Sequence, residues 1–288
     1  MLRLAGGGWA ATLLPERGAA FASLTLDGAD VLAPLPEGAD PNATPAGAFL
    51  MLPWANRLDG GRLPLPGGGE HRFPLDRPDE GNAIHGLARA RAWTVAEAAA
   101  DRARLTLRLA EPPYDTLDAE LRVSLGAGGL RLSLSATNRA DAPSPPVGHG
   151  WHPWFLRGPG ARVSFAATHR LETDAARNLP LRAVPDPGLA DADPVGHDTH
   201  FAGWGGTIRL DLDAPGAPPL VLRGEGAWSR HLQLYAPPDR PVLCAEPQSH
   251  ATDAANRSWL DALGPMRVLA PGESLEGAAL LARAAAAA

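Results

Sequence analysis

Short segments in which apolar and polar residues alternate recur through the chain, and this alternation constrains the fold more than any other feature. In residues 104–109, leucine occupies every second position and arginine or threonine occupies the positions between. A period of two residues is typical of antiparallel strands with one buried face. The same alternation occurs in 121–125, 130–135, 208–213 and 232–235. The sequence therefore predicts an all-β protein.

Glycine-rich clusters separate these segments and predict turns between the strands. They lie at 59–61, 67–69, 126–129, 158–160 and 205–206. Many closely spaced strands without a shift in composition predict one large antiparallel β-sandwich domain over residues 1–283. The alanine run 284–288 is predicted to be a disordered tail. Residues 179–201, rich in Pro, Asp and Gly, are expected to form a long ordered loop.

The charge and the basic residues restrict the possible chemistry. The formal net charge of −6 argues against nucleic acid or an anionic membrane surface as the main partner. All 26 basic residues are arginine, which excludes a lysine Schiff base and the phosphate-binding lysine of a P-loop.

Cys244 is the only cysteine, so the chain has no intramolecular disulfide and no cysteine-based zinc site. Its apolar neighbours predict a small buried side chain. The sequence shows no signal-peptide pattern and no apolar run of the ~20 residues needed to span a membrane. We therefore expect a soluble, cytoplasmic protein.

Four short motifs carry side chains suited to proton transfer. They are Trp54-Ala-Asn-Arg57, His85-Gly86, Gly148-His-Gly-Trp-His152-Pro-Trp-Phe155 and Cys244-Ala-Glu246-Pro247. Their order resembles that of the galactose mutarotase (aldose 1-epimerase) family, in which P-x-x-N-R, H-G, G-x-H-P-[YW]-F and E-P segments follow one another. The resemblance implies a galactose mutarotase-like supersandwich with its site in a cleft on one sheet. It also implies an isomerase of carbohydrate metabolism that interconverts the α and β anomers of a free aldose.

Mutarotation needs one general base and one general acid, so the resemblance implies no cofactor and no metal. Glu246 is the candidate base, because it follows an apolar strand and precedes a proline, where a carboxylate can be partly desolvated. His152 is the candidate acid, held among glycine, proline and aromatic residues. Without the resemblance, Glu246 is equally a surface glutamate and His152 a packed structural histidine. By the resemblance, His85 hydrogen-bonds the ring oxygen or nearby hydroxyls.

The resemblance also implies the substrate-binding residues. Arg57, helped by Asn56, is expected to donate to sugar hydroxyls, and Asp198 matches the aspartate of a D-x-x-F segment. Trp154 is a candidate for the flat apolar face that packs on the sugar. The expected partner is a monosaccharide, and the expected state is a monomer or weak homodimer. The shorter segment 76–82 and a tryptophan at 154 in place of the commoner tyrosine leave the identity of the sugar open.

Three other interpretations remain open. A hexose-6-phosphate mutarotase would need arginines at the cleft rim, for which Arg89, Arg91 and Arg157 are candidates. A non-catalytic sugar-binding protein could use the same scaffold. A cupin-like metalloenzyme could use the histidines of H149-x-x-H152 and H197-x-x-H200, but a spacing of three places two side chains on opposite faces of a strand.

Overall fold

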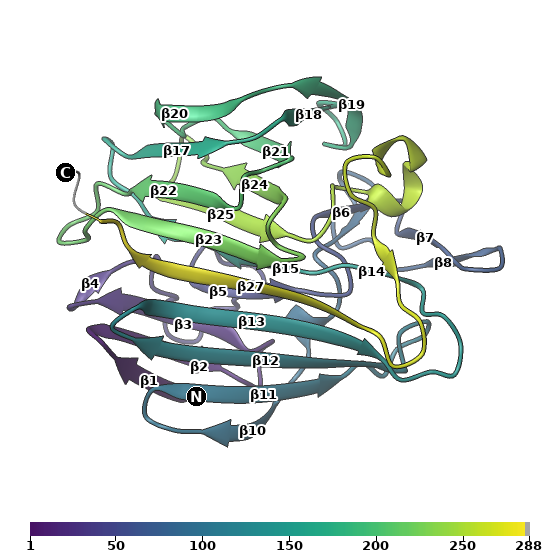
Figure 1. Ribbon diagram of the computed structural model, residues 1–288, viewed down its shortest axis with the longest axis horizontal. Helices are drawn as coiled ribbons and strands as arrows, with labels where there is room; N and C mark the ends of the chain where they lie inside the picture. The colour runs from purple at the N-terminus through teal and green to yellow at the C-terminus, as the bar shows by residue number, and fades with distance from the viewer. Residues whose placement is uncertain (286–288) are drawn as a thin grey trace.

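The computed structural model describes residues 1–285 and contains two large antiparallel sheets (Figure 1). The all-β antiparallel fold predicted from the alternation is confirmed. The larger sheet has twelve strands. Ten form a continuous path, in the order β1 (Leu2–Gly6), β2 (Trp9–Leu14), β3 (Ala20–Leu26), β5 (Ala48–Met51), β15 (Gly150–Pro153), β25 (Val242–Gln248), β24 (His231–Tyr235), β21 (Asp198–Ala202), β18 (His169–Thr173) and β19 (Pro180–Pro185). Two short strands join beside it: β4 (Ala29–Asp30) on β3 and β16 (Phe155–Leu156) on β25.

The second sheet has nine strands and includes the long central strands of the molecule. Its order is β10 (Thr94–Ala98), β11 (Arg102–Arg108), β12 (Leu117–Gly126), β13 (Gly129–Asn138), β27 (Ser274–Arg283), β23 (Leu220–Gly226), β22 (Thr207–Asp211), β17 (Arg162–Ala166) and β20 (Gly188–Ala192). The last long strand, β27, pairs with both β13 and β23, so the end of the chain closes the middle of this sheet.

Small elements complete the fold around one end of the larger sheet. Three two-stranded ribbons and three short 3-10 helices are present: β6 (Arg57–Asp59) with β9 (Asn82–Ile84), β7 (Arg62–Pro64) with β8 (Glu70–Arg72), β14 (Pro146–Val147) with β26 (Arg267–Val268), η1 (Ala88–Ala90), η2 (Ala254–Asn256) and η3 (Ser258–Leu260). Part of the predicted alanine tail, residues 286–288, lies outside the described residues. The division into one domain and a disordered tail stays a prediction.

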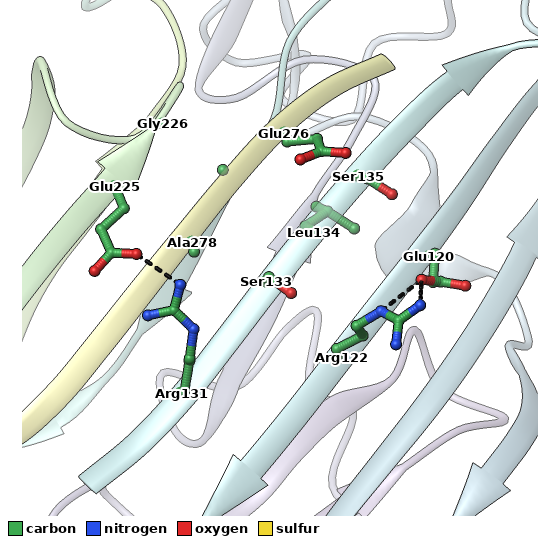
Figure 2. A pocket seen from close by; sticks show the side chains of 11 residues that line it. Glu120, Arg122, Arg131, Ser133, Leu134, Ser135, Glu225, Gly226, Glu276 and Ala278 are labelled. Carbon is green, nitrogen blue, oxygen red and sulfur yellow. Dashed lines mark hydrogen bonds and ion pairs between the residues drawn. The ribbon is translucent and has the colours of Figure 1, made fainter. Parts of the chain in front are cut away.

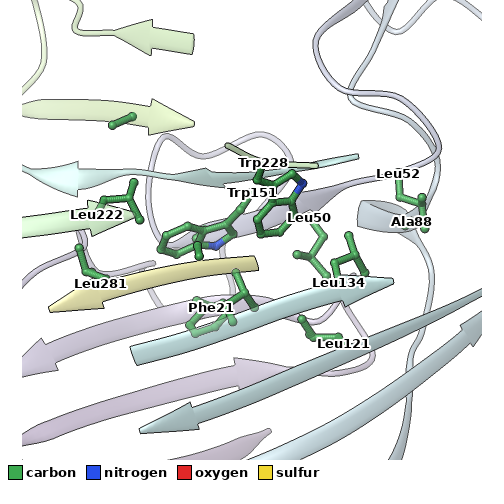
Figure 3. Close-up of a cluster of buried hydrophobic side chains, with 14 of the residues drawn as sticks. Phe21, Leu50, Leu52, Ala88, Leu121, Leu134, Trp151, Leu222, Trp228 and Leu281 are labelled. Atoms are coloured by element: carbon green, nitrogen blue, oxygen red, sulfur yellow. The ribbon is translucent and has the colours of Figure 1, made fainter. Parts of the chain in front are cut away.

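The main core lies between the two sheets and is formed by apolar side chains of both (Figure 3). Phe21, Leu50 and Trp151 come from the larger sheet, and Leu121 and Leu134 come from the smaller. All five are at most 1% exposed. Burial of such side chains contributes roughly 1.5–3 kcal/mol each. This contribution fixes which face of each strand points inward, and therefore also which residues point outward.

The prediction of a long loop over residues 179–201 is wrong. This segment contains β19, β20 and the start of β21, and it contributes to both sheets. Two of the four prolines in this segment, Pro180 and Pro185, lie at the ends of β19, which is an edge strand. Proline is tolerated there because an edge strand has one side without ladder hydrogen bonds. The other two, Pro187 and Pro194, lie in the connections before and after β20.

Two further expectations, one about Cys244 and one about membrane-spanning segments, can be compared with the structure. Cys244 is fully buried, as its apolar neighbours predicted. Within residues 1–285, no helix has the length and apolar character that crossing a membrane requires.

Candidate active site

A row of side chains crosses five adjacent strands on the face of the larger sheet that points away from the core. His152 on β15 lies opposite Phe49 on β5, and Gln233 on β24 lies opposite both Glu246 on β25 and His200 on β21. The pairing of Gly150 with Gln248 extends this antiparallel register, so that His152 and Glu246 are also neighbours across β15 and β25. The register thus brings the candidate acid and base together from motifs almost a hundred residues apart.

The alternation of each strand explains why this row faces outward. Trp151, Leu232, Leu234, Leu243 and Ala245 all belong to the core between the sheets. Their neighbours in sequence therefore project from the opposite face, because successive side chains of a strand point to opposite sides. Gln233, a polar residue of β24, is nevertheless buried, because the segments around the cleft cover this face of the sheet.

These loops and the sheet enclose a cleft of about 670 Å³. It is walled by residues 41–45 and 173–178 and by parts of β6 and β9. All seven residues predicted for the site line this cleft: Glu246, His152, His85, Arg57, Asn56, Asp198 and Trp154. The volume lies in the range typical of small-molecule sites.

Glu246 and His152 are titratable groups that lie side by side in the cleft. The His152 Nε2 and the Glu246 Oε1 are 3.3 Å apart, and the side chains are 6% and 2% exposed. Burial raises the pKa of the Glu246 carboxyl well above its ordinary value, and the nearby carboxylate of Asp198 raises it further. Burial, with the positive charge of Arg89, lowers the pKa of His152 to about 3. Both shifts favour the uncharged form of the group concerned.

Aromatic rings fix the plane of the His152 imidazole. Its ring centroid is 4.4 Å from that of Phe49 and 4.8 Å from that of Trp154, and both are tilted by about 30°. His85 meets it edge-on at 5.1 Å. Among the described residues, the His152 Nδ1 has no hydrogen-bond partner. The ring is therefore positioned by packing, with Nε2 directed at Glu246.

The His85-Gly86 motif is explained by backbone conformation. Both residues are left-handed, with φ of 60° and 70°. A Cβ at Gly86 would lie 2.2 Å from the carbonyl oxygen of Leu52, so only glycine fits. The turn places the His85 Nδ1 to accept a hydrogen bond from the backbone N–H of Asn56, at 3.2 Å. Burial is the main cause that lowers the pKa of His85 well below its ordinary value, so this ring too is neutral.

A hydrogen-bonded chain lines the other wall of the cleft. The Asn56 side chain accepts from the Arg57 guanidinium and donates to the Gln233 Oε1, at 3.2 and 3.1 Å. Gln233 Nε2 donates to one oxygen of Asp198 at 2.7 Å, and Asn178 donates to the other at 2.7 Å. Each group has a fixed orientation before any ligand arrives.

Arg57 is held by Glu80 through two hydrogen bonds, of 2.5 and 3.1 Å. The sequence motifs did not identify Glu80, Gln233 or Asn178. For Gln233 a signal exists, since it is a polar position in the alternating segment 232–235. Glu80 and Asn178 lie in loops, and their sequence context gives no comparable signal.

Of the three arginines considered for a phosphate group, only Arg89 lines the cleft. Its guanidinium donates to Asp76 at 2.6 Å and lies 5.7 Å above the ring of Phe49. Arg91 pairs with Glu111, and the buried Arg157 donates to the backbone carbonyls of Val242, Pro237 and Arg240. The arginine cluster that a phosphate would require is not formed by these three residues.

The four histidines of the cupin-like interpretation do not converge. His149 accepts a hydrogen bond from the indole of Trp228 at 2.7 Å, away from the cleft. His197 contacts Thr199, and His200 pairs with His231 at 3.0 Å. Only His152 lines the cleft.

Comparison with known proteins identifies the family. The family model for aldose 1-epimerase matches residues 4–281. The chain belongs to the aldose 1-epimerase family. The uncharacterized protein YphB of Escherichia coli (strain K12) is 27% identical over 255 residues, which cover 81% of this chain and 82% of YphB.

Two solved structures share the fold. A galactose mutarotase-like protein from Clostridium acetobutylicum superposes with a TM-score of 0.81 at 19% identity, covering 97% of this chain and 93% of that one. A galactose 1-epimerase from Lactobacillus acidophilus NCFM gives a TM-score of 0.72 at 20% identity, covering 96% and 91%. The galactose mutarotase-like fold expected from the motifs is thereby confirmed.

Proposed function

We propose that this chain is an aldose 1-epimerase, a cofactor-independent isomerase that interconverts the α and β anomers of a free aldose. The observation that carries the proposal is the contact of 3.3 Å between Glu246 and His152 on the floor of a cleft of monosaccharide size. Mutarotation requires removal of the proton from the C1 hydroxyl and protonation of the ring oxygen. A carboxyl and an imidazole that share one proton can do both.

The pair has the correct number of protons for this reaction. In the resting form the proton is on Glu246, as the raised pKa of the carboxyl and the lowered pKa of His152 indicate. Transfer of this proton to the His152 Nε2 gives a carboxylate base and an imidazolium acid without exchange with solvent. The base then accepts the proton of the C1 hydroxyl, and the imidazolium protonates the ring oxygen. The ring opens to the aldehyde, the C1–C2 bond rotates, and the ring closes with the opposite configuration.

The remaining residues bind and orient the sugar in this proposal. Arg57 and Asp198 offer a donor and an acceptor for hydroxyl groups, and their orientations are fixed through Asn56 and Gln233. His85 lies beside His152 and contacts the ring oxygen or a neighbouring hydroxyl. Trp154 lines the cleft and provides an apolar surface for the C–H face of the pyranose. Monomeric or weakly dimeric state, cytoplasmic location and the absence of nucleic-acid and membrane partners stay predictions.

The test is the rate of anomer interconversion with glucose, galactose and glucose 6-phosphate, measured by polarimetry with the spontaneous rate subtracted. The free sugars should be substrates. Glu246→Gln keeps the size of the side chain but cannot accept the proton, so kcat should fall by about 10²–10⁴. Glu225→Gln, on the exposed face of the other sheet, is the matched control and should keep the wild-type rate.

Two outcomes would contradict the proposal. A near wild-type rate in Glu246→Gln means that Glu246 is not the base. Sugar binding by the wild-type protein without any interconversion means that the chain is a sugar-binding protein on the scaffold of an enzyme.

A further inference from the structure

Cys244 lies next to the proposed acid–base pair, on the same face of β25 as Glu246. Leu243 and Ala245 belong to the core between the sheets, so the side chains of Cys244 and Glu246 project from the opposite face. One ligand atom each from His152, Cys244 and Glu246 lie within 4.8 Å of one another. All three residues are buried.

We propose that these three side chains form a binding site for a thiophilic divalent cation such as Zn²⁺, and that this cation inhibits the enzyme. A thiolate, an imidazole and a carboxylate are the three ligand types that zinc uses in proteins. Three protein ligands leave a fourth position for water, and His152 and Glu246 line the cleft through which an ion would enter. The inhibitory effect rests on the proposed function, because the ion would occupy both the acid and the base; the site itself does not.

The spacing of the ligand atoms fits the ion. Zinc bonds of roughly 2.0–2.1 Å to nitrogen and oxygen give a tetrahedral edge of about 3.3 Å between those two ligand atoms. The distance between the His152 Nε2 and the Glu246 Oε1 is 3.3 Å. The upper bound of 4.8 Å for the remaining pairs requires only a small movement of the Cys244 thiol, whose bond to zinc is longer, at about 2.3 Å.

The surroundings hold the proposed ligands in place. Gln248 donates to the second oxygen of Glu246 at 3.1 Å, the kind of outer hydrogen bond that orients a ligating carboxylate. The imidazole of His152 lies between two aromatic rings. Its Nδ1 has no partner among the described residues, and the ring is only 5% exposed.

Direct binding is tested on the full chain after treatment with a chelator and buffer exchange. Zn²⁺ should bind in a calorimetric titration, and Co²⁺ should give the near-ultraviolet charge-transfer absorption of a cobalt–thiolate bond. Because Cys244 is the only cysteine, such a band can come from no other residue. Mg²⁺, which prefers oxygen ligands, should not compete.

Two variants locate the site. Cys244→Ser and Cys244→Ala should lose the cobalt–thiolate band and bind Zn²⁺ at least about tenfold more weakly, because the thiolate is the preferred ligand of the set. Two replacements are used so that a folding defect in one, checked by thermal unfolding, leaves the other to decide. His197→Asn removes a histidine outside the proposed ligand set and is the control for adventitious binding; its zinc affinity should equal that of the wild type.

The rate measurement gives the functional consequence. Micromolar Zn²⁺ should slow mutarotation by the wild type and should have at least about tenfold less potency toward Cys244→Ala, which keeps the wild-type rate without metal. A chelator should leave the wild-type rate unchanged or raise it. Absence of the cobalt–thiolate band, or equal zinc affinity in all three cysteine forms, would overturn the site.

The two proposals fail separately. If the band and the Cys244-dependent affinity are present but no sugar is interconverted, the metal site stands and the proposed function falls. If mutarotation is catalysed but no cobalt–thiolate band forms, the function stands and the metal site falls.

Discussion

Two glutamates on outward-facing strands, Glu246 and Glu225, experience opposite environments. Glu246 lies on the cleft face of the larger sheet and is 2% exposed, and burial raises the pKa of its carboxyl. Glu225 lies on the outer face of the nine-stranded sheet with a side chain 46% exposed, and its hydrogen bond from Arg131 lowers its pKa. Both positions follow from the same alternation of apolar and polar residues. The difference comes from the loops that cover one sheet face and leave the other open.

The outer face of the nine-stranded sheet is a sheet surface with polar side chains that no loop within residues 1–285 covers. A shallow groove there is lined by arginine, glutamate and serine side chains from neighbouring strands (Figure 2). Arg131 pairs with Glu225 at 2.7 Å, and Arg122 pairs with Glu120 at 2.6 Å. Exposed pairs of this kind contribute little to stability. A groove with polar residues is therefore a weak indication of a site, whereas buried titratable residues with displaced pKa values are a stronger one.

The largest predicted effect that tests the difference between a cleft residue and a core residue is on the catalytic rate, and it concerns two histidines three residues apart. His152→Asn should lower kcat by about 10²–10⁴ because the imidazole is the proposed acid. His149→Asn should leave the rate unchanged but should cost about 1–3 kcal/mol of unfolding free energy. The Trp228 indole loses the imidazole acceptor and keeps only its longer bond to the backbone carbonyl of residue 149, and the buried carbonyl of Leu275 loses its partner. Kinetics and urea unfolding of both variants check the prediction. A large rate loss in His149→Asn, or none in His152→Asn, would mean that the assignment of the two faces is wrong.

The next effect is acid destabilisation from histidines that the cleft chemistry does not use. His149 and His250 are neutral hydrogen-bond acceptors, from the Trp228 indole and from the backbone N–H of Ala55. Burial lowers the pKa of each to about 4, against 6.5 in the unfolded chain. Between these values the unfolded chain binds more protons, so stability is present above pH 6.5 and is lost as the pH falls toward 4. Each histidine contributes up to about 1.4 kcal/mol per pH unit in this window.

Urea unfolding at several pH values between neutrality and pH 4 measures this loss. His149→Asn provides the control, because it should show a shallower dependence by the contribution of one histidine. The raised pKa of Glu246 has the opposite sign, since its contribution is lost as the pH rises. A free energy of unfolding that stays constant down to pH 4 would contradict the prediction.

The sequence predicted the fold and several residues that line the cleft, for physical reasons that particular segments make clear. In residues 104–109 every second side chain is apolar, and only a strand places all of them on one face that can be buried. This pattern lies within six consecutive residues. Gly86 and Pro247 restrict the backbone next to His85 and Glu246, so the family motifs carry recognisable residues. Each of these features depends on a few consecutive residues, so it can be recognised from the sequence alone.

Other features depend on strand register and loop position, which no short segment encodes. Gln233 belongs to the site because it lies opposite Glu246 across two strands. Glu80 belongs because a loop brings it to Arg57. Residues 179–201 were expected to be a loop, but edge strands tolerate the prolines at 180 and 185. In each example, contacts between segments distant in the sequence determined the outcome.

A smaller effect is expected from Arg57, one of the arginines that line the cleft. Arg57→Lys keeps the charge but loses the two-pronged contact with Glu80 and the bond to Asn56. KM for the sugar should rise by roughly tenfold with little change in kcat, because the proposed role of Arg57 is to bind the substrate without moving a proton. Arg131→Lys on the outer face is the matched control and should change neither constant. An unchanged KM in Arg57→Lys would remove this residue from the binding site.

The smallest effect should come from the ion pair between Arg131 and Glu225 itself. Both side chains are about half exposed, at 50% and 46%, so water screens their attraction. Glu225→Ala and Arg131→Ala should each change the free energy of unfolding by no more than about 0.5 kcal/mol. The coupling energy from the double-mutant cycle should lie near 0.2–1 kcal/mol and should decrease in high salt. If the coupling is several kcal/mol and insensitive to salt, the outer face is not the open, solvated surface described here, and the contrast with the cleft would need another cause than burial.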